Sequence, residues 1–297
     1  MNNNEGKGEL EAGKVDCNET LEIENIEVDL ILEAIWRRFG YDFRNYSKNS
    51  LTRRLNTMIQ DIDEKKLSGL IPKILYEKNF LPTILHHLTI QVSEMFRDPL
   101  FYKSLRENVI PILKTWPIIR IWCAGCATGE EAYSLAIVLQ EEGVYQRCLI
   151  YATDVNEEGL RQAIEGIYPI KKMREYSENY HKSDGKGSLN DYFSANYGSA
   201  IMDQSLKKNI VFSTHNLVSD SVFTEASMIF CRNVMIYFNQ KLKDSVMDTF
   251  AESLSAGGFL SLGSKENLIG CRAKERFSEF DPKNKIFRKK FGEVTNG

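Results

Sequence analysis

The 297-residue sequence contains no apolar run that approaches the roughly 18 residues of a transmembrane helix. It also has no excess of positive charge, since 38 Lys and Arg residues face 41 Asp and Glu residues and the net charge is −3. A general nucleic-acid binder is normally clearly basic, so this balance argues against one. The N-terminus is polar and acidic, which argues against a signal peptide. We therefore expect a cytoplasmic protein that is not inserted in a membrane and binds no nucleic acid.

Cysteine and histidine are sparse, with six and four residues respectively. The cysteines are scattered through a chain without an export signal, which favours reduced thiols. Cys123 and Cys126 form a C-x-x-C pair that is compatible with a redox or zinc element. No second such pair and no nearby His pair completes a zinc shell. We therefore favour packing of small residues in a tight turn and expect no metal.

The stretch 118–139 organises the rest of the chain. Residues 118–122 are a short apolar run, typical of a strand buried in a parallel sheet. Small residues follow at 124–129, and an apolar-periodic stretch that begins at Glu130 predicts a helix. A strand, a glycine turn and a helix form a nucleotide-sized crevice in open α/β sheets. The fold class is therefore α/β.

Two carboxylates at the start of this predicted helix restrict the ligand. Glu130 and Glu131 would repel a phosphate there, although their charge suits the helix dipole. Gly125 and Gly129 are four residues apart, which does not match the dinucleotide pattern G-x-G-x-x-G. S-adenosylmethionine (SAM) has cationic groups and no phosphate, so it fits better. The alternative is an ordinary tight turn between a strand and a helix.

A second predicted strand, 148–153, ends in Asp154, roughly 20 residues beyond the glycine turn. A carboxylate at that position can accept hydrogen bonds from both hydroxyls of a ribose. The alternative is that Asp154 caps a helix starting at Asn156, and the two roles can coexist.

Composition and periodicity divide the chain into five parts. They are a disordered tail (1–20), an all-helical N-terminal domain (21–92), a linker with a connecting helix (93–116), a sheet-containing domain (117–291) with an inserted small β-subdomain at about 171–208, and a second tail (292–297).

Six motifs occur in order along the chain. They are SEMFRD from Ser93, AGCATGEEAYS from Ala124, ATD ending at Asp154, NL at Asn216, CRNVMIYF from Cys231 and GSKENL from Gly263. Together they resemble the CheR family, the chemotaxis receptor glutamate O-methyltransferases, over nearly all of the chain from about residue 28 to residue 290. The resemblance implies a Rossmann-like SAM-dependent methyltransferase domain with a small inserted antiparallel β-subdomain, preceded by an all-helical N-terminal domain.

The resemblance also implies partners and site residues. The enzyme would act as a monomer on methyl-accepting chemotaxis receptors, with SAM as cofactor. Arg97 and Ser93 would lie on a segment that closes over SAM, Glu130 would meet its methionine end, and Asp154 its ribose. The implied cofactor-binding residues are Gln91, Ser93, Arg97, Ala124, Gly125, Glu130, Asp154, Val155, Asn216, Leu217, Asn233 and Val234. The implied catalytic residues are Arg97 and Tyr237, and the implied substrate-docking residues are Lys48, Arg53 and Arg54.

The closing segment departs from the family pattern at Gln91, Ser93 and Met95, which predicts an altered SAM affinity. Arg97 has an alternative role as a hinge ion pair with Glu94 or Asp98. Tyr237 is equally compatible with a core position after a strand. No dinucleotide fingerprint supports a dehydrogenase, and no D/N-P-P-Y/F tetrapeptide supports amino-methylation of a nucleic acid. A non-catalytic SAM-binding signalling module of the same fold remains the alternative.

Overall fold

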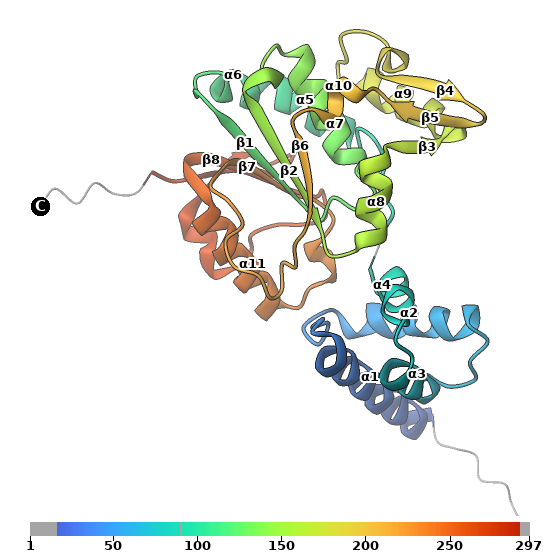
Figure 1. Cartoon of the computed structure of the whole chain (residues 1–297). Coiled ribbons are helices and arrows are strands. Elements are labelled where there is room, and N and C mark those ends of the chain that lie inside the picture. Colours follow the sequence, from blue (N-terminus) through green and yellow to red (C-terminus); the bar gives the residue numbers. More distant parts are fainter. Residues whose placement is uncertain (1–16, 90, 292–297) are drawn as a thin grey trace, which may run out of the picture.

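The computed structural model describes residues 17–89 and 91–291. The first helices form one unit, shown in blue and teal in Figure 1. They are α1 (Cys17–Phe39), α2 (Lys48–Asp61), α3 (Leu70–Tyr76) and α4 (Leu81–Leu88), with a 3-10 turn, η1 (Leu67–Gly69), before α3. The predicted disordered tail was wrong for residues 17–20, which open α1; residues 1–16 and the predicted tail 292–297 lie outside the described residues.

The helical unit has its own apolar core, as its periodicity predicts. Leu51, Leu55 and Met58 are spaced three and four residues apart on α2 and are almost completely buried. They pack with Val28 and Ile35 of α1 and with the apolar face of α4. A helix of this length is marginal alone, so this packing supplies most of its stability.

The second unit is a seven-stranded sheet in the order β6-β2-β1-β7-β8-β10-β9. The strands are β1 (Ile119–Ala124), β2 (Cys148–Asp154), β6 (Ile210–Thr214), β7 (Ala226–Cys231), β8 (Leu254–Leu262), β9 (Phe277–Asp281) and β10 (Ile286–Lys289). The first five in this sheet order, β6 to β8, are parallel, and β10 and β9 add antiparallel at one edge. The predicted α/β class is confirmed. Of the sheet's strands, β1 and β2 overlap the predicted ranges 118–122 and 148–153.

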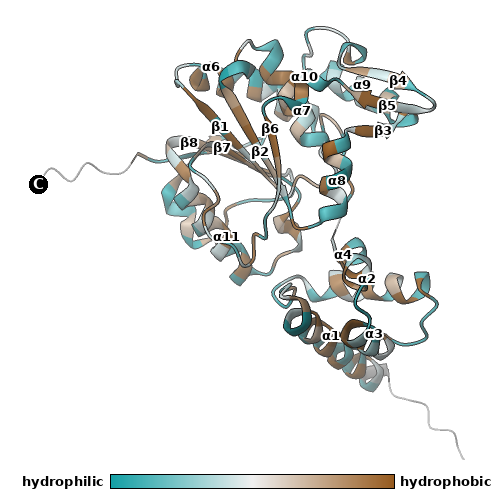
Figure 2. Ribbon diagram, viewed as in Figure 1, coloured by the Kyte–Doolittle hydropathy of each residue, from teal (hydrophilic) through white to brown (hydrophobic). Residues whose placement is uncertain are grey.

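Helices cover both faces of this sheet (Figure 1). They are α5 (Pro99–Ser104), continued by a π-turn (Leu105–Val109) into α6 (Ile110–Leu113), then α7 (Glu130–Glu141), α8 (Glu157–Glu165) and α11 (Gln240–Ser253). Alternate residues of β1 point to opposite faces, so Ile121 packs with α5 to α7 while Trp122 packs with α11. Figure 2 shows the strands as the most apolar part between these layers. Among the described helices, none has the length and hydropathy to cross a bilayer.

A small antiparallel sheet follows α8, in the order β3-β5-β4. Its strands are β3 (Ile167–Pro169), β4 (Phe193–Asn196) and β5 (Ser199–Met202), and α9 (Met173–Lys182) lies between β3 and β4 in the sequence. The insertion therefore begins before the predicted residue 171, because β3 pairs with β5. A short helix, α10 (Gln204–Lys207), leads back to β6.

A buried ion-pair network fastens this subdomain to the sheet. Arg106, on the π-turn, pairs with Glu141 and Glu142 at the end of α7, and the Arg106 side chain is 5% exposed. Its Nε donates to the Ser183 carbonyl at the end of α9, 3.1 Å away. Tyr180 of α9 donates to the same Glu141 carboxylate. One guanidinium therefore connects three helical segments.

We predict that Arg106→Ala lowers the free energy of unfolding by about 3–5 kcal/mol, because it leaves a buried carboxylate without its counter-charge. Urea denaturation measures this loss. The matched control is Arg174→Ala, since the Arg174 side chain is 90% exposed in its pair with Glu178; we expect a change within about 0.5 kcal/mol. A loss for Arg106→Ala no larger than that of the control would contradict the structural role.

Candidate cofactor and acceptor site

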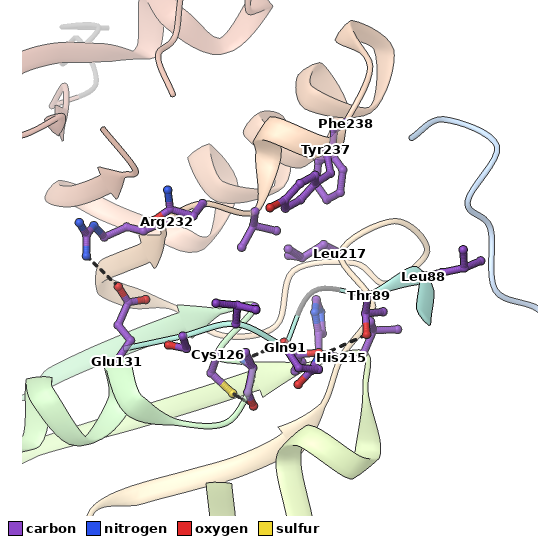
Figure 3. Close-up of a pocket in the computed structure, with 18 of the residues that line it drawn as sticks. Leu88, Thr89, Gln91, Cys126, Glu131, His215, Leu217, Arg232, Tyr237 and Phe238 are labelled. Carbon is purple, nitrogen blue, oxygen red and sulfur yellow. Dashed lines mark hydrogen bonds and ion pairs between the residues drawn. The ribbon is translucent and has the colours of Figure 1, made fainter. Parts of the chain in front are cut away.

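A cavity of about 230 Å3 lies at the carboxyl ends of β1, β2, β6 and β7, where the sheet meets α2 and α4 of the helical unit. Figure 3 shows its walls: Glu131 and Arg232 lie at one end, Leu88 and Thr89 at the other, and Tyr237 and Phe238 face Cys126 and Gln91 across it. Ligands of open α/β sheets bind in this crevice.

The floor of the cavity is the turn after β1. Gly125 has φ of +80°, and a Cβ at this position would lie 2.6 Å from Cγ2 of Val234. Glycine is therefore required both by the backbone conformation and by the close approach of the loop after β7. The backbone N–H groups of Gly125 and Cys126 donate to the Thr153 carbonyl, at 2.8 and 2.9 Å. These bonds hold the turn against the end of β2.

Asp154 ends β2 and faces the same cavity. One of its carboxylate oxygens accepts the N–H of Ala127, and the other accepts the N–H of Asn156, each at 2.9 Å. Burial raises the pKa of Asp154, and these N–H donors oppose that shift. Each oxygen keeps a lone pair for a further donor. The predicted capping role was wrong: Asn156 caps α8 by accepting from the N–H of Gly159 at 3.1 Å.

Two features of this site fit SAM. The carboxylates Glu130 and Glu131 at the start of α7 disfavour a phosphate there. The turn at Gly125 leaves no side chain between the backbone and the cavity, so a ligand can approach the backbone closely. Bound SAM would supply a methyl group on a positively charged sulfur, and Asp154 is the residue positioned to accept from its ribose hydroxyls.

Arg232 fixes the segment before α5. Its Nη2 is 2.6 Å from Asp98 Oδ2, and its Nη1 is 3.1 Å from Glu131 Oε1 and 3.2 Å from the Arg97 carbonyl. The guanidinium lies 4.1 Å from the centre of the Phe101 ring. Burial alone would lower the pKa of Arg232, but the negative charge of Glu131 raises it. Arg232 therefore stays charged and connects β7, α7 and the segment 91–98.

That segment is held in a strained backbone conformation. Phe96 and Asp98 have φ of +54° and +56°, which a bulky or branched side chain rarely adopts. The Phe96 N–H donates to Ser134 Oγ at 3.0 Å, and Asp98 pairs with Arg232. These two contacts maintain the path of the chain along the cavity, where Ser93 and Arg97 line the wall.

Arg54 has no acidic partner in the part of the chain that the structure describes. It lies on α2, is 9% exposed, and its Nη1 donates to the Leu88 carbonyl at the end of α4. Its Nη2 is buried without a hydrogen-bond partner, and within residues 17–89 and 91–291 no carboxylate forms an ion pair with it. The guanidinium lies 4.6 Å from the centre of the Tyr237 ring. Burial lowers the pKa of Arg54.

Most of the predicted site residues line the cavity together. These are Gln91, Ser93, Arg97, Gly125, Asp154, Val155, Asn216, Leu217, Asn233, Val234 and Tyr237, and the predicted docking residue Arg54 joins them. Four others lie outside it. Ala124 is buried at the end of β1, Glu130 is 1% exposed, Arg53 is exposed on α2, and Lys48 pairs with Asp29 at 2.8 Å.

The two neighbouring glutamates differ in their surroundings. Glu130 accepts from Thr128 Oγ1 at 2.6 Å and from Tyr176 Oη at 3.4 Å, and burial raises its pKa. Glu131 instead lines the cavity and pairs with Arg232. The contact of Glu130 with the methionine end of SAM stays a prediction. Arg97 makes one long ion pair, 3.9 Å to Glu94, as its alternative role suggested.

The C-x-x-C pair is buried beside the cavity. Cys123 and Cys126 are free thiols, and burial raises the pKa of both. A thiol of raised pKa is a poor nucleophile and metal ligand. Among the residues that the structure describes, no group of three His, Cys, Asp or Glu side chains could hold a metal ion.

Several lining residues were not predicted: Tyr46, Leu88, Thr89, Val92, Glu94, Cys126, Ala127, Glu131, His215, Arg232 and Phe238. Arg232 and Phe238 lie inside the CRNVMIYF motif, so the motif was a signal for them. Tyr46 reaches the site because its backbone bridges to Phe238 and its ring lies 4.9 Å from the Phe238 ring. No local pattern predicts that contact.

Comparison with known proteins gives a family. The model described as "CheR methyltransferase, SAM binding domain" matches residues 91–284. A Pseudomonas putida protein with the provisional name methyltransferase Cher3 is 46% identical over 89% of this chain and 97% of its own length. The chemotaxis protein methyltransferase of Listeria monocytogenes is 28% identical over 83% of this chain and 93% of its own. That of Borreliella burgdorferi is 26% identical over 93% and 96%.

A solved structure with a related fold is the N-methyltransferase NodS of Bradyrhizobium japonicum in complex with S-adenosylhomocysteine. It is 13% identical, with a TM-score of 0.36, over 66% of this chain and 89% of that one. This likeness is too small to add to the family assignment.

We predict that Asp154→Ala weakens SAM binding at least about tenfold, since each lost hydrogen bond to a charged group contributes about 1.5–3 kcal/mol. Isothermal titration calorimetry measures the affinity, and Asp154→Asn, which keeps one acceptor, should fall between. Glu252→Ala removes an exposed carboxylate of α11 and serves as the control. Wild-type affinity in Asp154→Ala would contradict the ribose role.

Proposed function

Because the chain belongs to the CheR methyltransferase family and is a SAM-dependent methyltransferase, we propose that it methylates glutamate side chains on the cytoplasmic helices of chemotaxis receptors. The product would be a glutamyl methyl ester. The enzyme would work in the cytoplasm and adjust receptor sensitivity. The observation that carries the proposal is the buried guanidinium of Arg54.

Arg54 supports a carboxylate acceptor on electrostatic grounds. A buried charge is unfavourable unless it is paired and hydrogen-bonded. The other buried arginines of the second unit, Arg106 and Arg232, have two carboxylates each. Among the described residues Arg54 has none, and its Nη2 has no hydrogen-bond partner there. A glutamate carboxylate of a bound receptor helix would satisfy both the charge and the donor, since a guanidinium fork matches a carboxylate.

The surroundings of Arg54 also support methyl transfer. Tyr237 lies beneath its guanidinium, at 4.6 Å to the ring centre, and lines the same cavity as Asp154. The Tyr237 carbonyl accepts the N–H of Ser47 at 2.7 Å. This bond holds the wall of the cavity that carries Tyr237 against the start of α2. A glutamate at Arg54 would therefore enter the end of the cavity that the helical unit closes.

The reaction requires little acid–base catalysis by the protein. A free glutamate has a pKa of about 4.3, so the acceptor is already ionised at neutral pH. A carboxylate oxygen forms a bond to the methyl carbon while the bond from carbon to sulfur breaks, and the sulfur keeps that electron pair and loses its charge. The tasks left to the protein are to align the acceptor and to exclude water. We assign alignment to Arg54 and Tyr237, and closure to the segment that carries Ser93 and Arg97.

The outer face of α2 is the proposed docking surface for the receptor. Arg53 is exposed there and has no ion-pair partner among the described residues. Lys48 already pairs with Asp29, but that pair is solvent-exposed and a surface ion pair contributes little. Arg53 and Lys48 would then attract acidic receptor helices, while Arg54 would hold the reacting side chain.

We predict that Arg54→Met lowers kcat/KM for a receptor fragment roughly ten- to a hundredfold, as expected for a charge-assisted hydrogen bond of about 1.5–3 kcal/mol. Methionine keeps an aliphatic side chain over Tyr237 while removing the charge. SAM affinity should stay within about twofold of wild type, because the predicted SAM contacts lie on other residues. Transfer of labelled methyl groups measures the rate.

Arg53→Met is the matched control, since it removes a neighbouring exposed arginine from the same helix. We expect its effect to be several-fold smaller. Arg54→Lys restores the charge and should recover part of the activity. Equal effects of the two methionine variants would contradict the acceptor role of Arg54. Wild-type protein that binds SAM but methylates no receptor fragment would favour a non-catalytic SAM-binding module.

The absence of a required general base predicts a flat pH profile. We expect kcat/KM for the receptor fragment to change less than about threefold between pH 6.5 and 8.5, because the acceptor stays ionised throughout. Initial rates in buffers of constant ionic strength test this. A bell-shaped profile centred near pH 7 would require an essential titrating group and would contradict the mechanism.

A further inference from the structure

The carbonyl groups at the end of α4 are held from two sides. The last four carbonyls of a helix have no partner inside it, so other groups must satisfy them. The Leu88 carbonyl accepts from Arg54 of α2. The Leu85 carbonyl accepts the backbone N–H of Thr89 at 3.0 Å and also accepts from the Asn156 side chain of the sheet domain, at 3.4 Å. The end of α4 therefore lies between Arg54, which we propose holds the acceptor glutamate, and the side of the cavity where Asp154 would bind SAM.

Asn156 uses every polar group it has at this joint. Its backbone N–H donates to Asp154 Oδ1, and its Oδ1 accepts the N–H of Gly159 and caps α8. Its Nδ2 donates to Thr89 Oγ1 at 2.8 Å as well as to the Leu85 carbonyl. The residue is 3% exposed, so these bonds are shielded from water. One residue, through its backbone N–H and its side chain, thus links the Asp154 carboxylate to the helical unit.

Thr89 is the other half of the joint. Its hydroxyl donates to the Leu85 carbonyl at 2.6 Å and accepts from Asn156 Nδ2. It also accepts from Gln91 Nε2 at 3.3 Å. Gln91 and Asp154 line the same cavity. Asp154 is therefore connected to Thr89 through Asn156.

We propose that Asn156 is a positioning residue, which sets the distance between Asp154 and Arg54 by fastening the end of α4 to the start of α8. This inference rests on the proposed function, because it concerns where the acceptor glutamate is held relative to the cofactor. Loss of the Asn156 amide frees α4, and with it Leu88 and Arg54, while Asp154 keeps its two backbone donors. The effect should fall on the acceptor and not on SAM.

The test is Asn156→Ser in the full chain. Serine still caps α8, since Ser and Asn are similarly good N-caps, but it has no amide to reach Leu85 and Thr89. We expect KM for the receptor fragment to rise roughly fivefold or more, with SAM affinity within about twofold of wild type. Asp203→Ser is the matched control. It alters the N-cap of α10, which lies outside the cavity, and should change neither quantity.

Thr89→Val removes the hydroxyl from the other side of the joint. If Asn156 acts through Thr89, the double variant should be no worse than the more impaired single variant, because the effects are not additive. An unchanged receptor KM in Asn156→Ser, additive effects in the double variant, or a loss confined to SAM affinity would each overturn the inference. Wild-type protein that methylates no receptor fragment would instead refute the proposed function, so the two failures are distinguishable.

Discussion

The site depends on one electrostatic constraint: a guanidinium is buried at the mouth of the cavity, and no carboxylate in the described part of the chain pairs with it. Arg54 donates to the Leu88 carbonyl and lies over Tyr237, which partly replaces its hydration. Neither contact neutralises the charge. Burial of an unpaired cation lowers stability, so such an arrangement usually serves a ligand. A bound acceptor carboxylate would pair with the Arg54 charge and remove this destabilisation. The pairing would therefore favour binding of the acceptor at the place where the reaction occurs.

The other buried arginines show what a satisfied charge does in this fold. Arg106 joins the β-subdomain to α7 through Glu141 and Glu142. Arg232 joins the closing segment to α7 through Asp98 and Glu131. Both arginines therefore hold elements around the cavity in place. Because their charges are already paired, they are not available to a substrate, whereas Arg54 is. The cavity lies where parallel strands end and where the helical unit closes it, so the proposed cofactor and acceptor sites share one space.

Local patterns were enough to predict the parts of the site that lie close together in the sequence. The turn at Gly125 and the carboxylate of Asp154 follow from strand, glycine and helix spacing, and both line the cavity. The contacts that close the site could not be predicted, because they join residues far apart. Arg232 meets Asp98 across 134 positions. Glu130 and Glu131 look alike in the sequence, but successive side chains of a helix point about 100° apart, so Glu131 faces the cavity and Glu130 faces Tyr176. The burial of Arg54 follows from the packing of α2 against α4 and the loop after β7. Periodicity alone does not predict this packing.

The measurement that tests the central claim most directly is the chemical stability of the transferred methyl group. A receptor cytoplasmic fragment is incubated with the protein and with SAM that carries a labelled methyl group, and the product is then treated with mild base. A glutamyl methyl ester would release the label as volatile methanol, as the account predicts. A label that stays on the receptor through base treatment would indicate methylation of nitrogen or sulfur and would contradict a carboxylate acceptor at Arg54.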